Sequence, residues 1–346
     1  MYITAAEALD RASHIVVIQA ENPDGDSLGS ALALEELLGN RGKQVSMYCK
    51  VNIPSYLRYF KGWDRVTADF PRKADLAIIV DTASATLLQK ALSPEVRTKL
   101  SHMPVIVFDH HVTKGDLPFP TIDVLDPSRV ATGELLLDFA EQSGWDITPD
   151  AADNLLGSIL ADSLGLTTEG TSPESVRSVA KLMEYGTHTS QVETRRREFM
   201  RKSPEILAYK GRLLQRIDYF LDGALAVIHI PWEEIEEYSD RFNPSVLVLD
   251  EMRLVDNVKI AVAIKTYPDG RITGKLRANP EAKIAEMVAG YFGGGGHPFS
   301  AGFRVYDNYE TVIKELVNAT DKALQNLSNT ASKNASTPAK SAQDGC

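Results

Sequence analysis

Short apolar runs alternate with segments of helical periodicity through the first part of this 346-residue chain. The runs fall at residues 15–20, 44–49, 76–81, 105–109 and 122–125. Runs such as LAIIV and VIVF are apolar at every position, which is typical of strands covered on both faces of a parallel sheet. The segment SLGSALALEELLGNRG, between the first two runs, has apolar residues at helical spacing and ends at Gly39-Asn40. The alternation predicts an α/β domain with a doubly wound, mostly parallel sheet.

The pattern changes from about residue 218 onward. Strand-like segments at 224–230, 258–266, 271–277 and 301–305 are interspersed with helix-like ones, which predicts a second, smaller mixed α/β domain. We therefore expect a first domain at 1–188, a helical linker at 189–217, the second domain at 218–326 across a cleft, and a tail at 327–346. The tail is small and polar, so we expect it to be disordered.

Composition excludes several classes of protein. The chain is 43% hydrophobic and 24% charged, as in ordinary globular proteins, and no apolar stretch reaches the roughly 20 residues of a membrane helix. We find no signal peptide, and the two cysteines, Cys49 and Cys346, suggest neither a disulfide framework nor a zinc site. A cytoplasmic location is expected. The net charge of -10 argues against binding to duplex DNA. Monomer and homodimer both remain open.

Acidic residues follow three of the apolar runs. These residues and their neighbours are Asp24 and Asp26 in QAENPDGDS, Asp81 after LAIIV, and Asp109, His110 and His111 after VIVF. The carboxyl ends of parallel strands lie along one edge of a sheet, so these side chains should converge there. Asp162, at the end of a later apolar helix, is a further candidate. A single aspartate after a strand is usually a turn residue or a helix cap, and Asp26 could cap the helix that follows.

Convergent carboxylates repel one another, and a divalent cation relieves the repulsion. Oxygen ligands with one or two imidazoles suit Mn²⁺ or Mg²⁺ better than metals that prefer thiolates. Four or more acids suggest two ions, which together can clamp a phosphoryl group during displacement. We read His14, His102, His188 and His229, which lie near no such cluster, as structural histidines.

A glycine run with basic residues nearby forms a second motif. In GGGGHPFSAG, the glycines Gly294, Gly295 and Gly296 offer backbone N–H groups to an anion, and His297 follows them. Lys275 and Arg277 on a predicted neighbouring strand favour a phosphate or nucleotide clamp over a flexible turn. For the arginine run at 195–197, a solvated helix face is favoured.

These motifs, in this order, resemble the DHH phosphoesterase family, in the branch of nanoRNases and phosphatases of 3′-phosphoadenosine-5′-phosphate (pAp). The resemblance covers about residues 1–325 and implies a catalytic DHH domain followed by a DHH-associated domain with the glycine motif. It implies two Mn²⁺ ions, with Mg²⁺ as an alternative, and a bridging aspartate at Asp81. By the same resemblance Asp26, His110 and Asp162 complete one metal site and Asp24 serves the other. His111 faces the substrate phosphate, with Asp109 holding the imidazoles.

The resemblance also assigns substrate contacts to the second domain and marks one departure. Arg277, Lys275 and His297, with the loop at 294–296, match contacts to the substrate. The family has a histidine four residues before the first aspartate, where this chain has Ala20. Alanine has no donor atom, so the metal site served by Asp24 lacks a nitrogen ligand. Glu21 or water are possible replacements.

The implied activity is hydrolysis of short RNA or DNA oligonucleotides, or of pAp, to nucleoside 5′-monophosphates. Cleavage of cyclic or linear dinucleotides is the closest alternative. A pyrophosphatase would share the metals but not the glycine motif with His297. A different class of protein, a nucleotide-binding module whose catalysis is lost or weakened by Ala20, also fits the sequence.

Overall fold

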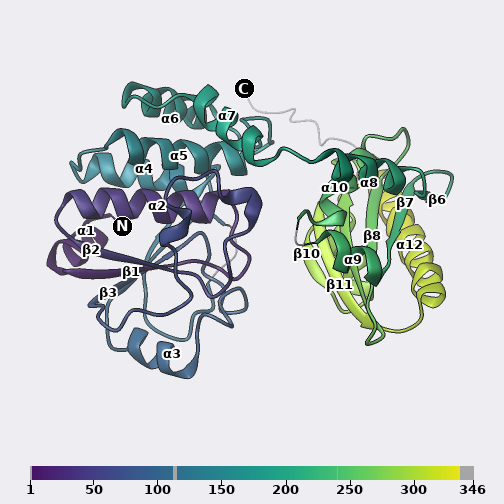
Figure 1. Ribbon diagram of the computed structural model, residues 1–346, viewed down its shortest axis with the longest axis horizontal. Helices are drawn as coiled ribbons and strands as arrows, with labels where there is room; N and C mark the ends of the chain where they lie inside the picture. Colours follow the sequence, from purple (N-terminus) through teal and green to yellow (C-terminus); the bar gives the residue numbers. More distant parts are fainter. Residues whose placement is uncertain (1, 112–114, 240, 336–346) are drawn as a thin grey trace, which may run out of the picture. The chain divides into compact units, whose positions relative to one another are not determined.

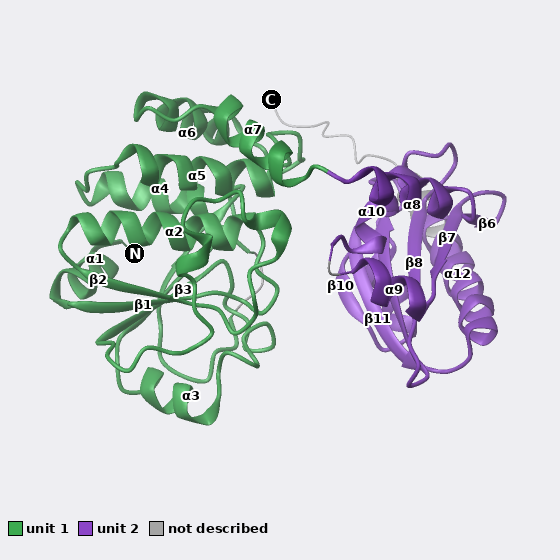
Figure 2. Cartoon of the chain, viewed as in Figure 1, with its two compact units in different colours: residues 1–201 green, residues 202–346 purple. Residues whose placement is uncertain are grey.

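The structure is a computed structural model that describes residues 2–111, 115–239 and 241–335. The chain forms two compact units, Met1–Arg201 and Lys202–Cys346, coloured green and purple in Figure 2. The boundary between them lies inside the predicted linker at 189–217. Each unit has a sheet and hydrophobic cores of its own. No helix in the described part of the chain is long and apolar enough to cross a membrane.

A five-stranded parallel sheet forms the centre of the first unit, in the order β2-β1-β3-β4-β5. Its strands are β1 (His14–Ile18), β2 (Gln44–Tyr48), β3 (Leu76–Val80), β4 (Val105–Asp109) and β5 (Ile122–Leu125). All five predicted strands are present, so the predicted α/β fold with a parallel sheet is confirmed. The strand order reverses between β1 and β3, and ligands bind at such switch points in open α/β sheets.

Helices cover both faces of this sheet. They are α1 (Tyr2–Arg11), α2 (Gly25–Asn40), α3 (Pro94–Leu100), α4 (Thr132–Gln142), α5 (Pro149–Asp162), α6 (Pro173–Glu184) and α7 (Thr189–Phe199), with short 3-10 turns at Ser55–Leu57 and Trp63–Arg65. Val17 and Ile78 face the core formed with α2, α4 and α5, whereas Val16 and Ile79 face the core formed with α3. Figure 1 shows the same arrangement, with α2, α4 and α5 stacked on one side of the sheet and α3 on the other.

The second unit contains a mixed six-stranded sheet in the order β10-β11-β9-β8-β7-β6. Its elements are α8 (Pro204–Leu214), β6 (Asp218–Phe220), β7 (Leu225–Ile230), α9 (Trp232–Tyr238), α10 (Pro244–Arg253), β8 (Ile260–Thr266), β9 (Arg271–Ala278), α11 (Ala285–Tyr291), β10 (Gly295–His297), β11 (Ser300–Tyr306) and α12 (Tyr309–Ala335). Only β7 and β8 are parallel, which confirms the predicted mixed α/β architecture. One core packs against α11 and α12, and the other against α8, α9 and α10.

The predicted glycine loop is partly a strand, because β10 forms a hairpin with β11. The two backbones approach too closely for a side chain at two positions. A Cβ atom at Gly294 would lie 2.2 Å from the carbonyl oxygen of Gly302, and one at Gly296 would lie 2.5 Å from that of Ser300. Gly296 also has a φ of 144°, which side chains disfavour. The glycines are therefore needed for strand pairing, whatever else they do.

Other boundaries also differ from expectation. The helical linker predicted at 189–217 consists of two helices, because Ser203 caps α8 and Pro204 occupies its first turn. The last helix extends past residue 326 to Ala335. Residues 336–346, the rest of the predicted tail, lie outside the described residues, so disorder there stays a prediction.

Candidate metal and phosphate site

The ends of β1, β3 and β4 bring the predicted acids and histidines together at the switch point of the sheet. Asp26 lies at the start of α2 after β1, Asp81 directly follows β3, and Asp109 is the last residue of β4. The strands are neighbours, so their carboxyl ends share one edge. The convergence expected from the sequence is present in the structure.

Asp26 is fixed by hydrogen bonds from three helices. Its two carboxylate oxygens accept from the backbone N–H groups of Thr132 and Gly133 at the start of α4, at 2.7 and 3.2 Å. The hydroxyls of Ser30 on α2 and Ser158 on α5 also donate to it. The side chain is only 1% exposed, and the positive end of α4 favours its negative charge. Asp26 is therefore held in place before any ligand binds.

Asp81 has an unusual backbone conformation for a residue with a side chain. Its φ is 62°, yet its N–H still pairs with the carbonyl of Phe108 at 2.8 Å, so the strand ladder continues into it. Left-handed residues other than glycine are strained and are concentrated at functional sites. Burial, followed by the charges of Asp26 and Asp24, raises the pKa of Asp81 well above its ordinary value. The Thr132 hydroxyl donates to the same carboxylate at 3.1 Å.

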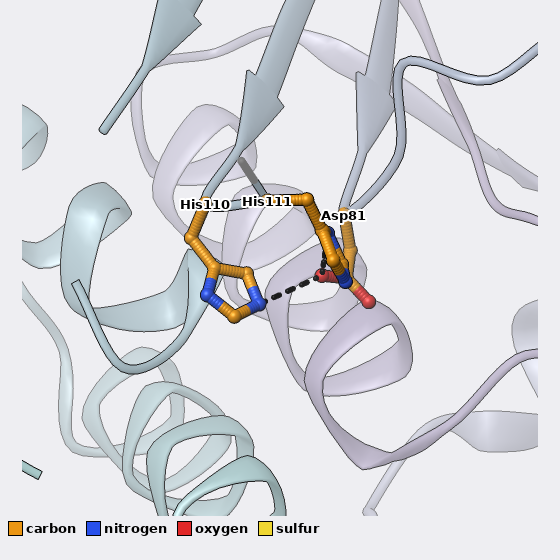
Figure 3. Close-up of side chains that lie close together, drawn as sticks. All are labelled: Asp81, His110 and His111. Carbon is orange, nitrogen blue, oxygen red and sulfur yellow. Dashed lines mark ion pairs between the residues drawn. The ribbon is translucent and has the colours of Figure 1, made fainter. Parts of the chain in front are cut away.

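His110 presents one ring nitrogen to three carboxylates. Its Nδ1 lies 3.2 Å from the carbonyl oxygen of Arg129, which can only accept, so Nδ1 carries the hydrogen. Its Nε2 lies 3.6 Å from Asp26 Oδ2, 3.6 Å from Asp81 Oδ1 and 3.5 Å from Asp162 Oδ2. Figure 3 shows the ring pointing at the carboxylate of Asp81. In this tautomer the Nε2 lone pair faces the carboxylates, as a metal ligand requires.

His111 is held by the acid at the end of β4. The Nδ1 atom lies 2.7 Å from Asp109 Oδ1, and the backbone N–H of His111 donates to the same oxygen at 3.1 Å. Asp109 is 2% exposed. The hydrogen bond to Asp109 raises the pKa of His111, although burial opposes the shift. Asp109 thus orients His111 and favours its protonated form.

Asp162 and Asp24, the two remaining predicted acids, lie at helix ends. Asp162 ends α5 and is about two-fifths exposed; burial and the charge of Asp26 raise its pKa to about 6. Asp24 is the N-cap of α2, with its carboxylate accepting from the N–H of Ser27 at 3.0 Å. The capping role considered for Asp26 therefore belongs to Asp24. Burial and the charge of Asp26 also raise the pKa of Asp24.

The donor set fits a divalent cation. Two groups have ligand atoms that all lie within 4.8 Å of one another: Asp81, His110 and His111, and Asp26, His110 and Asp162. Asp24 belongs to neither group. Burial and the neighbouring carboxylates raise the pKa values of Asp81 and Asp162, and a bound cation would stabilise their ionised forms. Oxygen donors with imidazoles match Mn²⁺ or Mg²⁺, and no thiolate is among them.

The segment that follows β1 contains Ala20, where the family has a histidine, and a buried side-chain amide without a hydrogen-bond partner among the described residues. Ala20 is 6% exposed, and its carbonyl accepts from Cys49 Sγ at 3.4 Å. Glu21 accepts from the backbone N–H of Lys90 and lies 3.7 Å from its ammonium group, so its carboxylate is engaged away from the cluster. The amide of Gln19 is completely buried, and neither of its polar atoms has a partner among the described residues. Such a group needs water or a ligand.

The second unit has a basic sheet face. Lys275 and Arg277 on β9 lie opposite Ala263 and Ala261 of β8. Burial lowers the pKa values of Lys275 and Arg277, and the two charges lie close enough for that of Arg277 to lower the pKa of Lys275 further. Lys265 on β8 belongs to the same face, with a pKa lowered to about 8 by burial and by Lys275. Concentrated, partly desolvated positive charge of this kind suits a phosphate.

The glycine hairpin adjoins this face. Ser300 and Gly302 of β11 pair with Arg277 and Lys275, and β10 with the exposed His297 lies on the far side of β11. The residues predicted to clamp a substrate therefore belong to one sheet, but β11 separates Lys275 and Arg277 on β9 from His297 on β10. No contact between His297 and Arg277 follows from this placement.

Several residues of the first site were not predicted from the sequence. Thr132, Ser158 and Ser30 hold the two central aspartates, and Arg129 orients His110 through its carbonyl oxygen. The N-terminus of α4 at TGE could have been identified as an anion-binding helix start, but the distance of Ser158 from the other residues in sequence conceals its role. His14, His102 and His229 contact Asp75, Thr98 and Thr266 respectively.

The fold and the site together define a two-unit α/β protein with a candidate metal centre at the switch point of a parallel sheet. Residues 14–160 match the family described as DHH family, N-terminal domain. The resemblance to this family inferred from the motifs is therefore confirmed over residues 14–160.

Characterised relatives extend the similarity across both units. The chain is 27% identical over 287 residues to the bifunctional oligoribonuclease and PAP phosphatase NrnA of Thermus thermophilus, covering 81% of each protein. It is 21% identical to the cyclic-di-AMP phosphodiesterase GdpP of Bacillus subtilis, covering 84% of this chain and 45% of that longer protein. These relatives are hydrolases of phosphate esters.

A solved structure shows the same fold. The crystal structure of an exopolyphosphatase-related protein from Bacteroides fragilis superposes with a TM-score of 0.84 at 22% identity. The match covers 94% of this chain and 97% of that one. Both units of the present fold therefore occur together in another protein.

Proposed function

We propose that this protein is a metal-dependent phosphoesterase that hydrolyses short oligonucleotides, pAp or both to nucleoside 5′-monophosphates. The observation that carries the proposal is the position of His110 Nε2, within 3.6 Å of oxygen atoms on Asp26, Asp81 and Asp162. Three acids around one imidazole are electrostatically unfavourable without a cation. The relatedness to NrnA supports the class of substrate.

The proposed ligands follow the geometry and the family resemblance. Asp81 would contribute to the sites of two ions; Asp26, His110 and Asp162 would complete one site, and Asp24 would serve the other. Mn²⁺ is the proposed ion and Mg²⁺ the alternative. When bound, two such ions supply Lewis-acid activation of a water molecule and charge neutralisation at the phosphate. Thr132, Ser30 and Ser158 keep the acidic ligands in position.

The protein's own side chains have distinct proposed roles in hydrolysis. His111, whose protonated form is favoured by Asp109, donates a hydrogen bond to a phosphate oxygen and stabilises its developing charge. Arg277 and Lys275 bind a further phosphate or the sugar end of the nucleotide, with His297 and the 294–296 backbone beside them. These groups bind and orient the substrate.

Two alternatives remain distinct. Cleavage of cyclic or linear dinucleotides would use the same residues, and the similarity to GdpP favours keeping it as the second candidate. A binding module without turnover would follow if Ala20 deprives one metal site of an essential ligand.

A substrate panel tests the proposal. The purified protein is incubated with pAp, the linear dinucleotide pApA, cyclic di-AMP and pyrophosphate, each with Mn²⁺, Mg²⁺ or a chelator. We expect AMP from pAp and from pApA with Mn²⁺, and none with the chelator. Pyrophosphate hydrolysis without nucleotide hydrolysis, or tight nucleotide binding without any product, would refute the proposal.

A further inference from the structure

A large hollow on the first unit starts at one of the candidate metal ligands and has no role in the function proposed above. Its volume is about 950 Å³, and Asp24 forms part of its wall. The residues that matter most in its lining are Tyr56, Leu164, Leu166, Glu193, Arg196 and Arg197. All of them belong to the first unit. A hollow of this size accommodates a drug-sized or nucleoside-sized ligand.

The floor of the hollow is formed where α2 and α5 meet. Gly25 and Ala161 both line it. A Cβ atom at Gly25 would lie 2.3 Å from the Cβ of Ala161, so the missing side chain lets the two helices approach. The hollow therefore adjoins the same helix ends that present Asp24 and Asp162.

One wall is a strained loop that exposes a leucine. Leu164, Gly165 and Leu166 follow Asp162 and have φ values of 49°, 73° and 69°. A left-handed conformation costs roughly 1–2 kcal/mol for a residue with a Cβ atom. Even so, the Leu164 side chain is 72% exposed, so burial of its own apolar surface does not offset the strain. Leu164 therefore presents apolar surface at the hollow that the described residues do not cover.

The other walls combine an aromatic ring with positive charge. Tyr56 is about half exposed, and burial together with the charge of Asp24 raises its pKa, which places its ring near that carboxylate. Arg196 and Arg197 share the carboxylate of Glu193, at 2.6 Å for each Nε atom, which leaves this group one net positive charge. A planar apolar ligand attached to a phosphate complements such a surface.

We propose that this hollow binds the second nucleoside of a dinucleotide, with its base against Tyr56 and Leu164. The inference rests on the proposed function, because the scissile phosphate must lie at the metal centre beside Asp24. It predicts that pApA, which has two nucleosides, uses the hollow, whereas pAp, which has one, does not.

Single substitutions in the hollow should affect the hydrolysis of pApA but not that of pAp. Tyr56→Ala and Leu164→Ala remove exposed side chains and leave the cluster unchanged; Ile3→Ala, at a 75% exposed position on α1, is the matched control. Loss of base stacking should raise the KM for pApA by roughly 5- to 100-fold. The KM for pAp should change less than about twofold, and Ile3→Ala should change neither. Thermal melting confirms that each variant is folded.

The outcomes distinguish this inference from the proposed function. If the wild-type protein hydrolyses both substrates and the variants lose pAp and pApA equally, or lose neither, the hollow is not a nucleoside site. If the wild-type protein hydrolyses neither, the proposed function is wrong. In that case the affinity for fluorescently labelled pApA, measured by anisotropy for the same variants, still decides whether the hollow binds the dinucleotide. An unchanged affinity would overturn the inference.

Discussion

At the scale of single residues, the site is an excess of negative charge held rigidly in a buried place. Asp26 is fixed by backbone donors from α4, and burial together with the charge of Asp26 raises the pKa values of Asp81 and Asp162. An arrangement that costs stability in the free protein is expected where a ligand later compensates for it. Stability in the absence of metal is therefore a direct measure of this cost.

The pH dependence of that stability follows from Asp162. Its pKa is about 6 in the folded protein and 3.8 in the unfolded reference, so between these values the folded state binds more protons. The metal-free protein should therefore become less stable as the pH rises from about 4 to about 6. Asp162→Asn removes this contribution. The melting temperature of the variant minus that of the wild type should therefore increase as the pH rises from about 4 to about 6 and stay constant above pH 6. A pH-independent difference, measured by calorimetry in chelator, would contradict the assignment.

Ala20 gives a second prediction at this scale. With Glu21 engaged by Lys90, no replacement ligand is evident from that residue, so the site served by Asp24 should bind Mn²⁺ more weakly than the other. Ala20→His should tighten the weaker site at least about tenfold, because even groups behind the ligands change affinity 10- to 100-fold. Calorimetric titration measures both affinities.

The matched variant is Glu21→Gln, which should leave both affinities unchanged. A reduced affinity in Glu21→Gln would show that Glu21 does replace the histidine. Because Ala20 is buried, circular dichroism must first show that Ala20→His folds. A folded Ala20→His variant with unchanged metal affinity would mean that the position does not face the metal.

At the scale of elements, the buried strands could be predicted from the sequence, whereas the β10 hairpin and the break between α7 and α8 could not. The apolar runs identified all five strands of the first sheet, because strands buried on both faces have an unmistakable composition. The hairpin of β10 was mistaken for a loop, since strand pairing between glycines leaves no side-chain pattern. The break between α7 and α8 lay at Ser203-Pro204, a start signal that the surrounding helical periodicity obscured.

The same contrast applies to the candidate site. The acids and histidines could be found because each follows a strand, whereas Ser158 and Arg129 act through contacts between distant segments. Lys265 was also missed: only the β8–β9 pairing places it on the face of Lys275. Residue spacing also did not reveal that Asp24 caps α2 or that it lies outside both groups of candidate metal ligands.

The basic face of β9 provides a prediction about substrate selectivity. Charge-assisted hydrogen bonds contribute about 1.5–3 kcal/mol, so Arg277→Ala should lower kcat/KM for pAp roughly 10- to 150-fold. A small chromogenic phosphodiester, which does not reach this face, should be affected less than about threefold. Arg241→Ala, which removes an arginine paired with Glu205 at 2.6 Å in the same unit, is the control. Equal losses on both substrates would show that this face does not bind the nucleotide.

At the scale of the whole molecule, each unit has its own cores, and the last helix belongs to the second unit. Val312, Leu316, Ala319 and Ala323 of α12 are buried in that unit's core. The described side chains at 325–328 are exposed. The end of the chain therefore contributes little to packing in the described structure.

Truncation after Asn326 tests this conclusion. The melting temperature should fall by less than about 4 °C, corresponding to a loss below roughly 1 kcal/mol, and kcat/KM for pAp should not change. Truncation after Val317, which removes Ala319 and Ala323 as well, should unfold the second unit or prevent expression. A large loss from the shorter truncation would show that the segment after residue 326 packs or reaches the substrate.

The central claim is that the acids and imidazoles at the sheet switch point form a metal centre that hydrolyses nucleotide phosphoesters. The most direct measurement is the rate of AMP release from pAp by wild type, Asp81→Asn and the exposed control Asp123→Asn, with Mn²⁺ and with chelator. We predict Mn²⁺-dependent release by wild type and by Asp123→Asn, and almost none by Asp81→Asn. Asp81→Asn should nevertheless melt no earlier than wild type in chelator, because it relieves charge repulsion. An Asp81→Asn variant that releases AMP at the wild-type rate with Mn²⁺ would contradict the account.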